Sequence, residues 1–127
     1  MVQKWYNEKI QGFIKDVVFK WCDFRAAFTQ TVNGGDFIYA DPPYAPESVT
    51  SFVGYTKDGF SLDDHRDLFN LLKRSKIDFV LSNAKVHLVT SSFEGYEVKD
   101  VPARRAIHSK DPSSTTTEVL VHGYAQK

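Results

Sequence analysis

The sequence is poor in cysteine and lacks long apolar runs. Its single cysteine, Cys22, cannot form an intrachain disulfide, and such scarcity is typical of a reducing, intracellular compartment. Because no long apolar run exists and the first ten residues are mostly polar, we expect neither a membrane span nor a signal peptide. Cys22 lies in an aromatic-rich run, so we expect it in the core.

Metal ligands and net charge are lacking as well. The four histidines, His65, His87, His108 and His122, show no ligand spacing, and we expect no metal site. The 16 basic residues balance the 16 acidic ones. The chain therefore has no global basic field to indicate a nucleic acid, and any phosphate contacts must come from a local cluster.

What the sequence does have is enough apolar material for one domain, residues 1–127. Hydrophobic residues make up 42% of the chain and aromatic residues 14%. Alternating strand and helix patterns, followed by two strands of alternating polarity, predict an α/β layered domain. The patterns predict an amphipathic helix within residues 3–14, strands at 17–21, 37–40 and 78–82, helices at about 24–32, from Ser61, and at 85–93, and an antiparallel edge pair at 96–101 and 118–124.

The most informative stretch is FIYADPPY, residues 37–44. Its first four residues predict a short, fully buried strand. Pro42 and Pro43 end that strand, because each lacks an N–H and has a fixed φ. Asp41 is thereby placed at the carboxyl end of a strand, where open α/β sheets bind ligands, and the aromatic ring of Tyr44 follows a stiff turn.

These four residues are suited to an amine conjugated to an aromatic ring, such as the exocyclic amine of adenine. The Asp41 carboxylate and the Pro42 carbonyl can accept its two N–H bonds, which frees the nitrogen lone pair for attack. Pro43 fixes the direction of that carbonyl, and Tyr44 can stack on the base. The alternative interpretation is a strand followed by an ordinary Pro-Pro turn.

Two further segments carry candidate binding residues. The connection over residues 45–60 contains Phe52, Tyr55 and Phe60, which indicates either a functional lid or a local apolar cap. The segment PARRAIHSK, residues 102–110, holds the densest positive charge. Its arginines, lysine and hydroxyls are the usual partners of phosphate, although the charge by itself favours an ordinary solvated hairpin connection. The residues concerned are Arg104, Arg105, Ser109 and Lys110.

The DPPY tetrad resembles motif IV of the amino-methyltransferases that use S-adenosylmethionine. The segments FKWCDF, FIYADPPYAPES, SFVGYTKDGFSLDDH, FVLSNA and VPARRAIHS follow in the order of Dam-type DNA adenine methyltransferases. The resemblance implies methyl transfer to a flipped adenine of double-stranded DNA, with Asp41, Pro42, Pro43 and Tyr44 catalytic. It also implies a partial Rossmann-like fold, with a mostly parallel sheet and an antiparallel C-terminal strand pair.

The same resemblance assigns cofactor and DNA contacts. Asp23, Phe24, Tyr39 and Asp41 would border S-adenosylmethionine. Phe52 and Tyr55 would belong to a loop that orders on DNA, and the basic segment would lie close to the active site and the DNA. Residues 1–14 would be the end of the target-recognition region.

One part of the resembled family has no counterpart in this sequence. No two of its seven glycines are spaced as G-x-G, so the glycine-rich cofactor loop is missing. We therefore expect the chain to match only the C-terminal half of such an enzyme. It is then one piece of a split enzyme whose second chain supplies the loop and the recognition domain, the product of a truncated gene, or a rearranged domain. The alternatives are a non-catalytic remnant that binds DNA or a partner, and a methyltransferase acting on RNA or protein.

Overall fold

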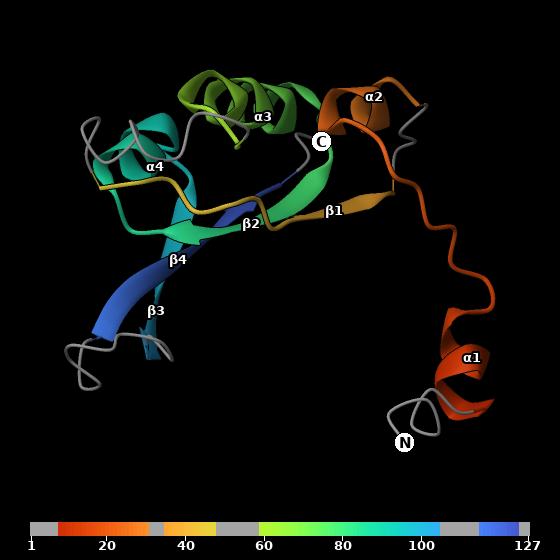
Figure 1. Cartoon of the computed structure of the whole chain (residues 1–127). Coiled ribbons are helices and arrows are strands. Elements are labelled where there is room, and N and C mark those ends of the chain that lie inside the picture. The colour runs from red at the N-terminus through yellow and green to blue at the C-terminus, as the bar shows by residue number, and fades with distance from the viewer. Residues whose placement is uncertain (1–7, 31–34, 48–58, 105–114, 125–127) are drawn as a thin grey trace.

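The computed structural model describes residues 8–30, 35–47, 59–104 and 115–124 (Figure 1). Helices and strands alternate over most of this length, as the sequence predicts. Their order is α1 (Glu8–Ile14), α2 (Phe24–Thr29), β1 (Phe37–Ala40), α3 (Leu62–Arg74), β2 (Asp78–Ala84), α4 (His87–Ser92), β3 (Glu97–Arg104) and β4 (Thr115–Gly123).

The described strands form one sheet in the order β1-β2-β4-β3. The predicted antiparallel pairing of the last two strands is confirmed. The prediction of a mostly parallel sheet is wrong, because only β1 and β2 run parallel, whereas β2 and β4 run antiparallel. A parallel pair needs a crossover connection, and α3 lies in the one that joins β1 to β2. The fold is thus a mixed α/β layer.

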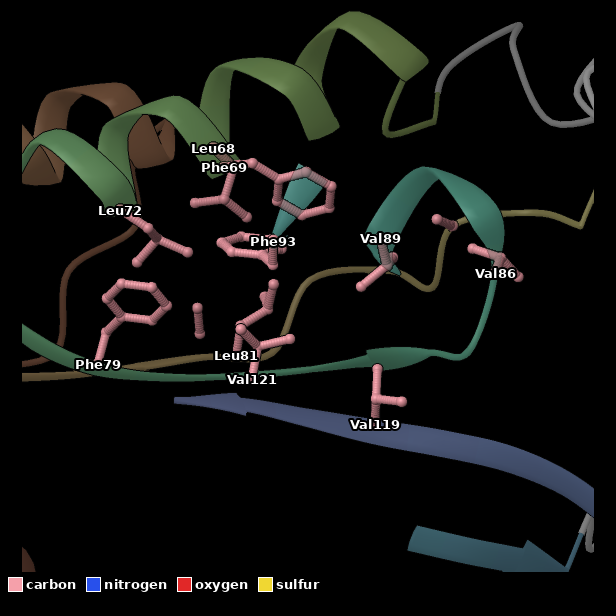
Figure 2. Close-up of a cluster of buried hydrophobic side chains, with 12 residues drawn as sticks. Leu68, Phe69, Leu72, Phe79, Leu81, Val86, Val89, Phe93, Val119 and Val121 are labelled. Atoms are coloured by element: carbon pink, nitrogen blue, oxygen red, sulfur yellow. The ribbon is translucent and has the colours of Figure 1, made fainter. Parts of the chain in front are cut away.

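Helices α2, α3 and α4 cover one face of the sheet (Figure 1). The core lies between them and the middle strands (Figure 2). Phe69 and Leu72 point down from α3 onto Leu81 of β2 and Val121 of β4, and all four side chains are almost fully buried. Burial of this apolar surface is the main favourable term that holds the layers together.

Helix α3 forms where its end signals predict it. Ser61 caps the first turn: its hydroxyl accepts from the N–H of Asp64, and the Asp64 carboxylate accepts from the N–H of Ser61, which completes a capping box. Lys73 and Arg74 lie in the last turn, where the helix dipole favours positive charge. The buried face includes Phe69 and Leu72, as expected, and also a histidine, His65.

The prediction of a strand at residues 17–21 is wrong. No described strand pairs with this segment, which runs extended toward α2. Phe19 is 76% exposed and Trp21 is fully exposed. Cys22, expected in the core, is exposed as well. A strand forms only against a neighbour that takes up its N–H and C=O groups, and among the described residues this segment has none.

Strand β1 is not fully buried as predicted. Ala40 is buried and Ile38 packs against the core, whereas Phe37 and Tyr39 are exposed. Because β1 ends the sheet and the helices cover a single face, alternate side chains remain on the uncovered face. We call the free side of β1 the open edge.

Helix α1 covers the described part of the helix predicted within residues 3–14, and it lies apart from the sheet (Figure 1). None of its side chains from Lys9 to Ile14 is buried, so the amphipathic pattern has no covered face among the described residues. The assignment of residues 1–14 to a recognition region stays a prediction. No described helix is long and apolar enough to cross a membrane.

Candidate active site

The tetrad lies where the sequence places it, at the carboxyl end of β1. Asp41, Pro43 and Tyr44 are exposed and Pro42 is half-buried, whereas the next residue, Ala45, is buried. The acid and the aromatic ring are therefore accessible to a ligand while the chain just beyond them is anchored. An exposed carboxylate beside an aromatic ring is the arrangement that an amine-bearing base would require.

A cavity of about 270 Å³ adjoins the tetrad on the helix side of β1. It brings together three of the predicted cofactor residues, Phe24, Tyr39 and Asp41. The other residues that line it are mostly apolar or aromatic, and they are Ala27, Phe28, Ile38, Ala40, Pro42, Phe60 and Leu68. A neighbouring cavity of about 290 Å³ shares Ala27, Phe28 and Ile38, which extends the hollow along the open edge.

The fourth predicted cofactor residue, Asp23, does not line this cavity. Its carboxylate caps α2 by accepting from the N–H of Arg25 at 2.8 Å, and it also accepts from the Arg25 guanidinium. The same guanidinium reaches Asp64 at 2.7 Å and Asp67 at 2.6 Å, which joins α2 to α3. Among the described contacts, Asp23 thus serves the helix junction beside the cavity.

The junction changes the pKa of its charged groups. The hydrogen bonds that Arg25 donates to Asp64 first, and to Asp67 next, raise the pKa of Arg25. The Arg25 guanidinium, followed by the backbone N–H and hydroxyl of Ser61, lowers the pKa of Asp64 from 3.8 to about 2. Arg25 and Asp64 are therefore both charged at neutral pH, and their ionic contact lies next to Phe24.

The ring of Tyr44 projects beside β2 with its hydroxyl 3.4 Å from the Ser82 hydroxyl. That hydrogen bond lowers the pKa of Tyr44, but burial and the hydrogen bond and charge of Glu118 outweigh it, so the pKa is raised. The phenol is therefore neutral at physiological pH. A neutral ring with one face in solvent is suited to stacking on a base.

Two buried side chains that the sequence interpretation overlooked hold the turn around Tyr44. The Nε2 of His65 lies 2.9 Å from the carbonyl oxygen of Pro43, and the N–H of Ala45 donates to Oδ1 of Asn83 at 2.9 Å. The available signals were weak. His65 lies one turn inside a capped helix, and Asn83 follows Ser82 directly after the apolar run of β2.

The predicted DNA-contacting residues fall mostly outside the described part of the chain. Phe52, Tyr55, Arg105, Ser109 and Lys110 lie there, and for Arg104 only the backbone is described, paired with Thr115 at the end of β3. Phe60, from the same connection as Phe52, packs between Phe24 and His65, with ring centroids 5.4 Å and 4.7 Å away. For Phe60 the structure therefore matches the local-cap interpretation. Within the described ranges, no group of three or more His, Cys, Asp or Glu side chains could hold a metal ion.

Comparison with known proteins points to a single family. Residues 2–107 match the family model of the D12 class N6 adenine-specific DNA methyltransferases. The chain is 36% identical over 107 residues to the Type II methyltransferase M1.LlaDCHI of Lactococcus lactis subsp. cremoris, which covers 80% of the chain and 37% of that protein. It is 33% identical over 112 residues to a DNA adenine methylase of Haemophilus influenzae, covering 84% of the chain and 39% of that protein. The chain thus spans less than two fifths of the length of these curated relatives.

Proposed function

Since this chain belongs to the D12 class of N6 adenine-specific DNA methyltransferases, we propose that it carries the amine-binding half of such an enzyme. The substrate is a flipped adenine in double-stranded DNA, because the amine is otherwise paired inside the duplex. The observation that carries the proposal is the exposed Asp41 carboxylate at the end of β1, beside an apolar cavity and the ring of Tyr44.

The tetrad acts by holding and polarising the amine. The Asp41 carboxylate and the Pro42 carbonyl each accept one N–H of the adenine amine, and Tyr44 stacks on the base. The lone pair is then free to accept the methyl group that S-adenosylmethionine would supply when bound. No covalent intermediate with the protein is needed, so positioning and electrostatics supply the rate enhancement.

The described residues fit one end of S-adenosylmethionine. Phe24 and Tyr39 offer apolar surface to its adenine ring, and Asp41 stands at the methyl end. When bound, the cofactor supplies an electrophilic methyl group. The cavity of about 270 Å³ is smaller than most complete ligand pockets, which are roughly 300–1,000 Å³. It therefore fits a part of the cofactor rather than its whole length.

The DNA contacts remain part of the proposal. Arg104 stands at the end of β3, where it leads into the basic segment with Arg105, Ser109 and Lys110. Arginine, lysine and hydroxyl groups make most protein contacts to phosphate. Phe52 and Tyr55 would order against the DNA from the connection between β1 and α3.

The decisive test replaces Asp41 by asparagine in an assembly that transfers methyl groups. Such an assembly combines the chain with the part of the lactococcal relative that the chain does not match. Asp41→Asn keeps the shape but adds N–H₂ donors and removes the charge, so transfer to adenine should fall by several orders of magnitude, about 3–5 kcal/mol of transition-state stabilisation. Asp63→Asn, at an exposed acid in the first turn of α3, serves as the matched control. Retention of more than about a tenth of the rate by Asp41→Asn would assign Asp41 a structural role.

A split arrangement is the second part of the proposal. It is supported by the open edge of β1 and by the exposed apolar side chains of residues 17–21. A second chain carrying the glycine loop and recognition helices would pair with this edge and complete the cofactor site. The lone chain should then bind S-adenosylmethionine only in the millimolar range or weaker, because two or three charge-assisted contacts at roughly 1.5–3 kcal/mol each are missing.

Isothermal titration measures this directly. Addition of the complementary segment of the lactococcal relative should restore micromolar binding and methyl transfer together. If the lone chain binds the cofactor with micromolar affinity, the second chain is unnecessary for the cofactor site. If neither the lone chain nor its mixture with the complementary segment binds the cofactor, but both bind DNA, the chain is better described as a non-catalytic remnant.

A further inference from the structure

Two buried side chains fix the two peptide units that flank Tyr44. On one side, the Pro43 carbonyl oxygen lies 2.9 Å from Nε2 of His65, which is 1% exposed. On the other side, the Ala45 N–H donates over 2.9 Å to Oδ1 of Asn83, which is 0% exposed. The two contacts come from different elements, α3 and β2. They hold the peptide units on either side of one residue of the tetrad, Tyr44.

Each of these side chains is itself held in place. The Nδ1 of His65 lies 2.9 Å from the Ser61 carbonyl oxygen at the start of α3, and its ring packs edge-on against Phe60. Oδ1 of Asn83 also accepts from the Ala84 N–H at 2.9 Å. Because both partners of that atom are N–H donors, the atom must be the amide oxygen, which fixes the orientation of the Asn83 amide.

We propose that His65 and Asn83 are positioning residues for Tyr44, and this inference rests on the proposed function. A peptide unit is planar, so fixing the units on both sides of Tyr44 leaves the ring only its own side-chain torsions. The stacking platform is then set by α3 and β2, while Asp41 comes from β1. Since Pro42 and Pro43 are stiff, an anchor on the Pro43 carbonyl also limits the direction of the Pro42 carbonyl.

The chemistry of the His65 contact is specific. Both ring nitrogens of His65 lie near carbonyl oxygens, which only accept, and a neutral ring has one N–H to donate. The proposal places that hydrogen on Nε2, which donates to Pro43. Glutamine at this position can still present an N–H donor, whereas leucine cannot. In the same way, aspartate at position 83 keeps an acceptor for the Ala45 N–H and leucine removes it. These pairs separate the hydrogen bond from the filling of the buried volume.

The first arm of the test uses the lone chain and requires no activity. In ¹⁵N spectra of the unaltered chain, Nε2 of His65 should have the chemical shift of a nitrogen that carries hydrogen. A pyridine-type Nε2 overturns the His65 contact without any variant. In Asn83→Leu, amide hydrogen exchange at Ala45 should be roughly tenfold faster than in Asn83→Asp. Equal exchange rates, measured with equal overall stability, overturn the Asn83 contact. His87→Leu, at an exposed histidine of α4, is the control.

The second arm uses the assembly with the complementary segment of the lactococcal relative. His65→Leu and Asn83→Leu should each lower kcat/KM for DNA by about tenfold or more, with His65→Gln and Asn83→Asp recovering much of the loss. If the unaltered assembly methylates adenine and the leucine variants match it, the positioning role is wrong while the proposed function stands. If the unaltered assembly transfers nothing but the first arm succeeds, the proposed function fails and the fixed geometry of Tyr44 is retained.

Discussion

The two halves of the sheet differ in how far their apolar side chains are covered. In the half around β4, which we call the completed end, α3 and α4 cover β2 and β4, so that Leu81, Val119 and Val121 are fully buried, although β3 beyond them is an edge strand with mostly exposed side chains. At the β1 end, one edge is open and the apolar side chains of residues 17–21 lie in solvent. Similar apolar strand patterns thus had opposite outcomes, and the difference lies in whether the described chain supplies a neighbour.

The catalytic tetrad stands at the boundary between these two ends. Asp41 continues from the open strand β1, whereas Tyr44 is anchored through Ser82, Asn83 and His65 to the completed end. The turn that carries the proposed amine-binding residues is therefore held by the completed end of the sheet. The cavity proposed for the cofactor lies along β1 instead.

The largest expected effect compares one phenylalanine from each end. Phe69, 1% exposed, should cost about 3–5 kcal/mol of unfolding free energy when replaced by alanine, because a large cavity opens beneath α3. Phe19→Ala, at a side chain that packs on nothing in the described structure, should change stability by less than about 0.5 kcal/mol. Urea denaturation of the two variants measures both values. Similar losses would mean that residues 17–21 are packed in solution and that the open end is closed.

The sequence predicted the completed end well and the open end poorly. The capping box at Ser61, the buried strand β2 and the alternating last strands are local patterns, and each one found its partner within the chain. Residues 17–21 carry an equally good strand pattern, yet pairing is a property of two segments and cannot be predicted from one. For the same reason, the parallel content of the sheet was overestimated.

For the candidate site, the sequence predicted which residues lie together better than it predicted the contacts of each residue. The DPPY tetrad and the shared cavity of Phe24, Tyr39 and Asp41 follow from motif and strand position. Asp23 was expected to border the cofactor, but its carboxylate pairs with Arg25. Arg25 also pairs with Asp64 and Asp67, which are distant in the sequence, so no local pattern could predict these contacts. His65 was missed because its partner is a backbone carbonyl, and backbone partners have no signature in a sequence.

A smaller effect concerns a close contact near the end of β4. A Cβ added at Gly123 would meet ring atoms of Phe79 at 2.0–2.6 Å, and Phe79 is itself buried. Gly123→Ala should therefore cost about 1–3 kcal/mol through overpacking. Gly12→Ala, in α1 with open space around it, should be neutral or stabilising by up to about 1 kcal/mol. Thermal unfolding of both variants compares them. If Gly123→Ala leaves the stability unchanged, the ring of Phe79 can move aside and this end of the sheet is less tightly packed than the close contact indicates.

The next effect depends on pH and tests the junction between the two ends. Asp64 has its pKa lowered from 3.8 to about 2, with the Arg25 guanidinium as the largest cause. A lowered pKa in the folded state means that its stabilisation is fully present above about pH 4 and is lost as the pH falls toward about 2. Asp64→Asn should remove up to about 1 kcal/mol near neutral pH, since the pair is partly screened by solvent.

The measurement is the melting temperature of the unaltered chain and of Asp64→Asn from about pH 5 down to about pH 2. The gap between the two curves should shrink as the pH falls. Asp63→Asn, in the same helical turn but exposed, should leave a constant gap. A gap for Asp64→Asn that stays constant to the acid end would show that the ionic junction contributes nothing to folding.

The smallest expected effect on the lone chain is at Trp21, and it is the most informative about the open end. Trp21→Ser should change the stability of the chain by less than about 0.5 kcal/mol, because the indole is fully exposed. If the open edge is where a second chain docks, the same variant should weaken binding of the complementary segment by about 2 kcal/mol or more, since buried tryptophans are typical interface hot spots. Calorimetric titration of the complementary segment into both chains measures the difference. Phe13→Ser, at another exposed aromatic residue but on α1, is the control.

A Trp21 variant that binds the segment as tightly as the unaltered chain would exclude residues 17–21 from the interface, and pairing would then have to occur along β1 alone. A solvent-exposed tryptophan that is neutral for folding and costly for binding would instead identify the incomplete end of the sheet as an interface.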